Sequence, residues 1–170
     1  HRLGYRILRW ILAVALASGV VVSAIQVILD AQRVSRGLDS DAKQSIAMVK
    51  DAATQAVFSI DAELAQQVVD GLFAKEAVHM ARIVHPDGDP LGDRSRPLQE
   101  TAFRPVTDPI FDADRLYREP LFREGNPEDV YGFLDVHYDT AAAARTWLDR
   151  AAVTFASGMA TALILGMVLF

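Results

Sequence analysis

The sequence predicts an α+β protein in which two membrane-spanning helices flank a domain of long helices packed on a small antiparallel sheet. Three observations lead to this prediction. Residues 10–29 and 151–170 are each twenty residues long and carry no formal charge, which is the length of a helix that crosses a bilayer. Between them, helical periodicity gives way to short apolar runs that are separated by turn-forming residues.

The first apolar stretch, residues 10–29, predicts a transmembrane helix with a defined orientation. Three arginines precede it within residues 1–9, and Asp30 follows it directly. Positive charge stays in the cytoplasm, so residues 1–9 are expected there and residues 30–150 on the outer side of the membrane. A cleaved signal peptide is the alternative, but it usually has an apolar core of about 7 to 15 residues and a small-residue cleavage site. Ile25–Leu29 lacks such a site.

The second apolar stretch, residues 151–170, would return the chain to the cytoplasm. The sequence stops inside this run, so we expect it to be a fragment of a longer protein. Both stretches carry small residues four apart, a pattern that lets helix backbones approach closely in lipid but is also common in membrane helices generally. These small residues are Ala15, Gly19 and Ser23 in the first stretch and Gly158, Ala162 and Gly166 in the second.

The charge pattern and the composition argue against a nucleic-acid-binding protein and against a disulfide-stabilised one. All 22 acidic residues lie between Asp30 and Arg150, and the net charge of the chain is −5. No basic run is long enough to indicate nucleic-acid binding. The chain has no cysteine, so its domain must be stabilised by packing without disulfides.

The first half of the domain is predicted to be helical. Apolar residues recur every three or four positions from Ala31 to Phe58, and Asp61 is a suitable N-cap for a second helix over residues 62–73. The stripe on the first helix is typical of a domain core or a dimer seam, and we expect a homodimer. Its residues are Val34, Leu38, Ala42, Ile46, Val49, Ala53 and Val57.

The second half is predicted to form the sheet. Residues 77–85 and 86–89 have the pattern of a strand and a turn, and residues 94–101 that of a loop. Pro105 confines a weak strand at 102–106 to a sheet edge. Further strands are expected at 115–123 and 130–138, joined as a hairpin, before Thr140 caps a helix that begins at Ala141.

Three segments resemble the N-terminal sensor region of membrane-anchored GGDEF-EAL proteins that control biofilm and motility. They are DAATQAVFSIDAELAQQVVDGLFAKEAVHMARIVHPDG (Asp51–Gly88), SRPLQ (Ser95–Gln99) and YGFLDVHYDT (Tyr131–Thr140). The resemblance implies a PAS-like or CACHE-like periplasmic domain. It also implies a cytoplasmic EAL domain, absent from this sequence, that hydrolyses cyclic-di-GMP with a divalent metal. None of the catalytic residues of that family, and no cofactor, would belong to this chain.

Two sets of side chains are candidates for binding. Arg82, Tyr117, Arg118, Tyr131 and His137 could line a pocket for a small anion, since arginine grips carboxylates through two hydrogen bonds, or could be solvated strand residues. His79, His85 and His137 could together bind a metal or respond to periplasmic pH. Because cysteine and a close histidine pair are missing, we expect no metal site.

We therefore expect a signal-sensing module that binds a periplasmic small molecule or protein and regulates a cyclic-di-GMP phosphodiesterase. Two alternatives remain open. The output could be a histidine kinase or a diguanylate cyclase, or the domain could be a protein-interaction platform without a small ligand. An enzyme in the periplasmic part is disfavoured, because no constellation of catalytic residues is visible.

Overall fold

The computed structural model describes residues 2–122 and 129–168, with side chains omitted at 2–9, 11, 12, 15, 162, 163 and 165–168. The chain divides into two compact units. One comprises residues up to Ser35 together with those from Arg145 onward, and the other comprises Arg36–Ala144. These boundaries lie within six residues of the predicted limits of the periplasmic domain.

The first unit is made of parts of two long helices: α1 (Arg2–Ser59) as far as Ser35, and α4 (Ala141–Val168) from Arg145 onward. Among the described residues, one helix, the part of α1 from Leu16 to Ser59, is long and apolar enough to cross a membrane. A signal sequence near the N-terminus can meet the same criteria of length and composition. Large apolar side chains of α1 are exposed, as expected of a surface that faces lipid: Val14, Leu16, Val20, Val21, Val22, Ile25, Ile28 and Leu29.

The predicted second span lies in α4, where most side chains after Thr161 are outside the described residues, so this span stays a prediction. The predicted helix seam is supported at one position but not at Gly19, where nothing lies within 4 Å of an added Cβ atom. Ser23 of α1 is buried, and a Cβ atom on Gly158 of α4 would lie 2.9 Å from its hydroxyl oxygen. The seam residues Ala15, Ala162 and Gly166 fall among the undescribed side chains. Trp147 Nε1 also donates a hydrogen bond to the Val27 carbonyl at 3.2 Å.

The second unit begins with the end of α1 and continues into α2 (Ala62–Phe73). The predicted break between them is confirmed. Ile60 has a φ of 53°, a left-handed conformation that ends α1, and the Asp61 carboxylate accepts a hydrogen bond from the Leu64 N–H at 3.0 Å. Asp61 is thus the N-cap that the sequence predicts.

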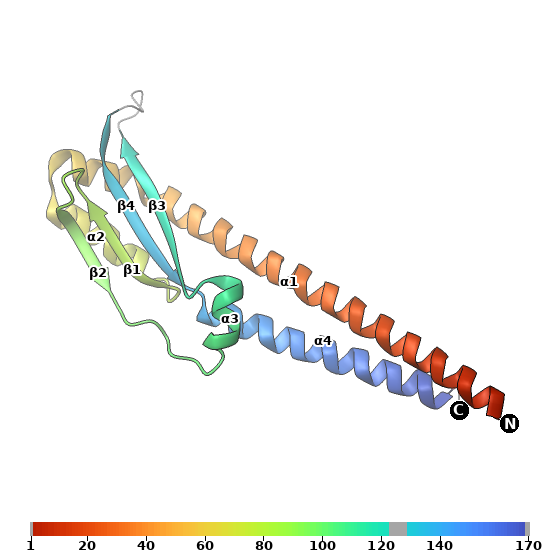
Figure 1. The fold of residues 1–170 in the computed structure, drawn as a ribbon. Helices are drawn as coiled ribbons and strands as arrows, with labels where there is room; N and C mark the ends of the chain where they lie inside the picture. Colours follow the sequence, from red (N-terminus) through yellow and green to blue (C-terminus); the bar gives the residue numbers. More distant parts are fainter. Residues whose placement is uncertain (1, 123–128, 169–170) are drawn as a thin grey trace. The chain divides into compact units, whose positions relative to one another are not determined.

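Four strands form one antiparallel sheet in the order β2-β1-β4-β3 (Figure 1). Their bounds are β1 (Val78–Val84), β2 (Pro90–Ser95), β3 (Asp114–Phe122) and β4 (Val130–Asp139). The first and last strands are therefore neighbours at the centre of the sheet. This arrangement confirms the α+β class, with a long N-terminal helix packed on a small antiparallel sheet.

The core lies between the helices and one face of the sheet, which we call the inner face. It takes alternate residues of β4, namely Leu134, Val136 and Tyr138, and the apolar stripe of α1. Ala42, Ile46, Ala53 and Val57 of that stripe are buried here. The stripe thus packs in the core of its own domain. It gives no support to the homodimer, which remains a prediction.

Two sequence predictions in this unit were wrong. Residues 94 and 95, predicted as part of a loop, are the last two of β2, whose Pro90 occupies the first position of an edge strand, where proline is tolerated. The weak strand at 102–106 is replaced by α3 (Arg104–Phe111), with Pro105 in its first turn. Proline is favoured there because the first helical N–H groups need no partner within the helix.

Candidate functional site

The candidate site lies on the outer face of the sheet, opposite the core, and is organised by β4. Because successive strand residues alternate between faces, the three residues that follow Leu134, Val136 and Tyr138 point outward. They are Asp135, His137 and Asp139. Each is the centre of a separate group of polar contacts.

The first group is an ion-paired carboxylate. Asp135 is 1% exposed and receives two hydrogen bonds from Arg118, at 2.7 and 2.8 Å. Arg82 approaches the same carboxylate at 3.6 Å. The Arg118 hydrogen bonds hold the pKa of Asp135 below its usual value against the opposing effect of burial, and Arg82 adds to this shift. Asp135 is therefore the anion that both arginines bind.

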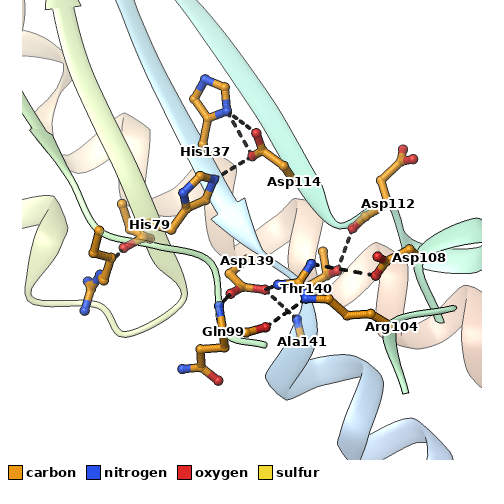
Figure 2. Close-up of polar contacts among 12 residues, drawn as sticks. His79, Gln99, Arg104, Asp108, Asp112, Asp114, His137, Asp139, Thr140 and Ala141 are labelled. Atoms are coloured by element: carbon orange, nitrogen blue, oxygen red, sulfur yellow. Dashed lines mark hydrogen bonds and ion pairs between the residues drawn. The ribbon is translucent and has the colours of Figure 1, made fainter. Parts of the chain in front are cut away.

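The second group joins two histidines to one carboxylate. His79 Nε2 lies 2.8 Å from Asp114 Oδ1, and His137 Nδ1 lies 2.8 Å from Asp114 Oδ2 (Figure 2). The two rings are edge to face with centroids 5.6 Å apart. Burial opposes ionisation of Asp114, but the hydrogen bonds from both histidines outweigh it and lower the pKa of this carboxyl.

A β-bulge brings His79 into this group. Val78 pairs with Tyr138 and Met80 with His137, so His79 is an extra residue on β1 that has no partner of its own on β4. Bulges redirect side chains and occur often beside functional sites. Asp114 reaches the group from the start of β3, diagonally across from His137, whose partner on β3 is Leu116.

The third group lies where β4 meets α4. The Asp139 carboxylate accepts hydrogen bonds from the Gln99 N–H at 2.7 Å, from Arg104 Nη2 at 3.1 Å and from the Ala141 N–H at 2.9 Å (Figure 2). Thr140 precedes α4 as predicted, and its hydroxyl donates to the Asp112 carbonyl. Asp139 thereby connects the sheet, the segment before α3 and the start of α4.

A separate pocket of about 490 Å³ lies between the end of α1 and the ends of β3 and β4. Tyr131 packs edge to face on Phe58, with ring centroids 5.4 Å apart, and Lys50 Nζ lies 4.6 Å from the centre of the Phe122 ring. Lys50 also forms an ion pair with Glu119. The remaining lining residues are polar: Asp51, Thr54 and Gln55.

The structure does not bring the five predicted binding residues into one pocket. Arg82 and Arg118 share Asp135, and His137 lies two residues further along β4. Tyr117 points the other way and donates a hydrogen bond to Asp39 of α1, while Tyr131 lines the separate pocket. The prediction of a single anion pocket fails because these residues lie on both faces and at both ends of the strands.

The histidine prediction is corrected in its third member. His79 and His137 meet as expected, but His85 lies beyond the end of β1 and contacts Asp87 in the turn, at 3.1 Å. Asp114 takes the third place, which sequence reasoning missed because it is 35 residues from His79. Two imidazoles and one carboxylate are a donor set that can hold a divalent metal.

Comparison with known proteins adds no assignment, since no protein-family model and no curated protein matches this sequence.

Proposed function

We propose that this chain is the signal-sensing module of a bacterial inner-membrane protein. Residues 1–9 lie in the cytoplasm, α1 crosses the membrane, and the domain from residue 30 to 150 is a PAS-like sensor in the periplasm. α4 returns to the cytoplasm, where a GGDEF-EAL phosphodiesterase that hydrolyses cyclic-di-GMP is the output. The apolar exposed surface of α1 and the long helices packed on an antiparallel sheet support this proposal.

The observation that carries the proposal is the position of Asp139. It ends the strand that bears the outer-face groups, and its carboxylate binds the first N–H of α4. A ligand that favours one arrangement of β4 shifts the population of conformations at the point where the exit helix begins. Binding on the sheet is thus linked to α4 by one buried side chain.

The pocket beside Tyr131 favours small-molecule sensing over a protein-interaction platform. It combines aromatic rings with hydrogen-bonding side chains, as small-ligand sites generally do. A small molecule with an apolar body and polar substituents fits this lining. A platform would instead present a sheet end filled by its own side chains.

The proposed orientation is tested by reporter fusions in bacterial cells. Alkaline phosphatase, which is active in the periplasm, is inserted at Gly88 in the exposed turn, and a cytoplasmic reporter is inserted there in parallel. We expect phosphatase activity only. Activity of the cytoplasmic reporter at Gly88 would contradict the membrane topology.

The proposed linkage is tested in the full-length protein. Cyclic-di-GMP hydrolysis by membranes is compared between the parent, Asp139→Asn and the matched control Asp89→Asn, which changes an exposed carboxylate in the turn. We expect Asp139→Asn to change the rate and the control to leave it unaltered. Equal rates in all three would refute the role of Asp139, whereas phospho-transfer activity in place of hydrolysis would favour a kinase output.

A further inference from the structure

We propose that His79, Asp114 and His137 form a binding site for one divalent first-row transition-metal ion, for which Zn²⁺ is the best-suited probe. The three side chains come from β1, β3 and β4 and each offers one ligand atom. These ligand atoms all lie within 4.8 Å of one another.

The donor set selects the class of metal. Imidazole nitrogen suits Zn²⁺, Cu²⁺ and Ni²⁺, whereas Mg²⁺ and Ca²⁺ prefer sites made of oxygen ligands alone. Two histidines and one carboxylate are also the protein ligands of zinc sites that keep an exchangeable position. The carboxylate supplies the negative charge that partly compensates the ion.

The directions of the side chains fit a common ligand. His79 Nε2 and His137 Nδ1 both point at the Asp114 carboxylate, at 2.8 Å each (Figure 2). With metal–ligand distances of about 2.1 Å, tetrahedral ligand atoms lie about 3.4 Å apart. An ion can therefore replace the hydrogen-bonded protons if each of the two histidine nitrogens moves roughly half an ångström away from the Asp114 carboxylate.

The site is positioned by the sheet and remains open to solvent. The bulge at His79 places this ring against His137, on strands held by regular pairing on either side. The side chains of His79, His137 and Asp114 are 12%, 18% and 37% exposed. A bound ion can thus keep a fourth position for water or a small ligand, which is typical of exchangeable rather than structural zinc.

Neighbouring carboxylates on β4 do not compete for the ion. Asp135 is bound by two arginines, and Asp139 by Arg104 and two backbone N–H groups. An ion at His137 would join β1, β3 and β4 two residues before Asp139. Its use as a signal rests on the proposed sensing function, whereas binding itself does not.

Binding is tested by titrating Zn²⁺ into the full 170-residue chain in lipid nanodiscs, with His1→Ala in every version to remove the fourth histidine of the chain. We expect one ion per chain. His79→Gln, His137→Gln and Asp114→Asn should each weaken binding by at least ~10-fold, since even the loss of groups that orient metal ligands has effects of this size. His85→Gln is the matched control and should bind like the parent.

A spectroscopic measurement keeps the test decisive if a variant is less stable. Co²⁺ is added to the parent and to His85→Gln. The visible absorption of both should show Co²⁺ with a low coordination number, and Zn²⁺ should abolish this absorption by displacing Co²⁺. Parent protein without a saturable site, or three variants that bind as tightly as His85→Gln, would overturn the proposal.

A functional measurement separates the metal site from the proposed function. Hydrolysis of cyclic-di-GMP by full-length protein in membranes should change on addition of Zn²⁺, and this response should be lost in His137→Gln. If Zn²⁺ binds but the rate of cyclic-di-GMP hydrolysis is the same with and without it, the role of the ion as a signal is overturned. Intact binding with no hydrolysis at all would instead contradict the proposed output.

Discussion

Arg104 Nη2 donates a hydrogen bond to Asp139 Oδ1 at 3.1 Å, which ties the first turn of α3 to the last residue of β4. The Asp139 side chain is 6% exposed and Arg104 18% exposed. The same carboxylate accepts the N–H groups of Gln99 and Ala141. One buried charge thus determines how three segments of the domain meet.

We predict that Asp139→Ala lowers the free energy of unfolding by about 3 kcal/mol, because it leaves Arg104 and two N–H groups without their shared acceptor. Hydrogen exchange should increase around residues 99, 104 and 141. The control Asp89→Ala, in the exposed turn, should leave exchange at these positions unchanged. Equal protection in both variants would show that Asp139 does not hold this junction.

Two aspartate–arginine pairs should differ in their effect on stability. Asp135 is buried against Arg118 and Arg82, whereas Asp70 pairs with Arg94 on the surface at 2.8 Å. Asp135→Ala should reduce the free energy of unfolding by about 2 kcal/mol, since it removes charged hydrogen bonds from a desolvated site. Asp70→Ala should leave the unfolding midpoint unaltered in a denaturant titration. A similar loss in both variants would contradict this account.

Two glycines should respond oppositely to a methyl group. At Gly132 a Cβ would lie 2.4 Å from the Val84 carbonyl oxygen and 3.1 Å from a Val57 methyl group, whereas nothing lies within 4 Å at Gly71. Gly132→Ala should therefore destabilise the domain by about 3 kcal/mol. Gly71→Ala, within α2, should stabilise it by about 0.5 to 1 kcal/mol. Thermal unfolding would measure both, and a tolerated Gly132→Ala would refute the close approach of β1 and β4.

The stability of the domain should fall in alkaline solution because of Tyr117. Burial and the hydrogen bond with Asp39 raise the pKa of Tyr117 from 10.0 to about 12. The folded state therefore keeps a proton that the unfolded state releases, so this contribution to stability is complete below pH 10.0 and is lost as the pH rises to about 12.

Tyr117→Phe removes this dependence. We expect the unfolding temperature of the variant to fall less steeply than that of the parent between pH 10.0 and about pH 12. Absorbance of ionised tyrosine should also show that the phenol that titrates at about pH 12 in the parent is missing. Parallel pH profiles for the two proteins would contradict the raised pKa.

Much of the domain follows from local patterns in the sequence. The break at Ile60, the N-cap Asp61 and the strands β1, β3 and β4 were predicted because periodicity and turn residues mark them. β2 was missed because Pro90 and Gly92 disfavour an extended strand, and its pairing with β1 comes from tertiary structure. Pro105 indicated a strand edge but lies in the first turn of α3.

The site was less predictable than the fold. Alternation along β4 places Leu134 and Asp135 on opposite faces, but it does not show that Arg82 and Arg118 share that carboxylate. The group of His79, Asp114 and His137 depends on a bulge and on strand order. The bulge and the strand order are properties of the folded sheet. Neither produces a spacing in the sequence from which Asp114 could be predicted.

The central claim is that this segment senses a signal outside the membrane and controls cyclic-di-GMP hydrolysis within the cell. It is tested most directly by measuring that hydrolysis in membranes that contain the full-length protein or a version without residues 30–150. The account predicts hydrolysis in both, at rates that differ. No hydrolysis in either, or identical rates in the two, would contradict it.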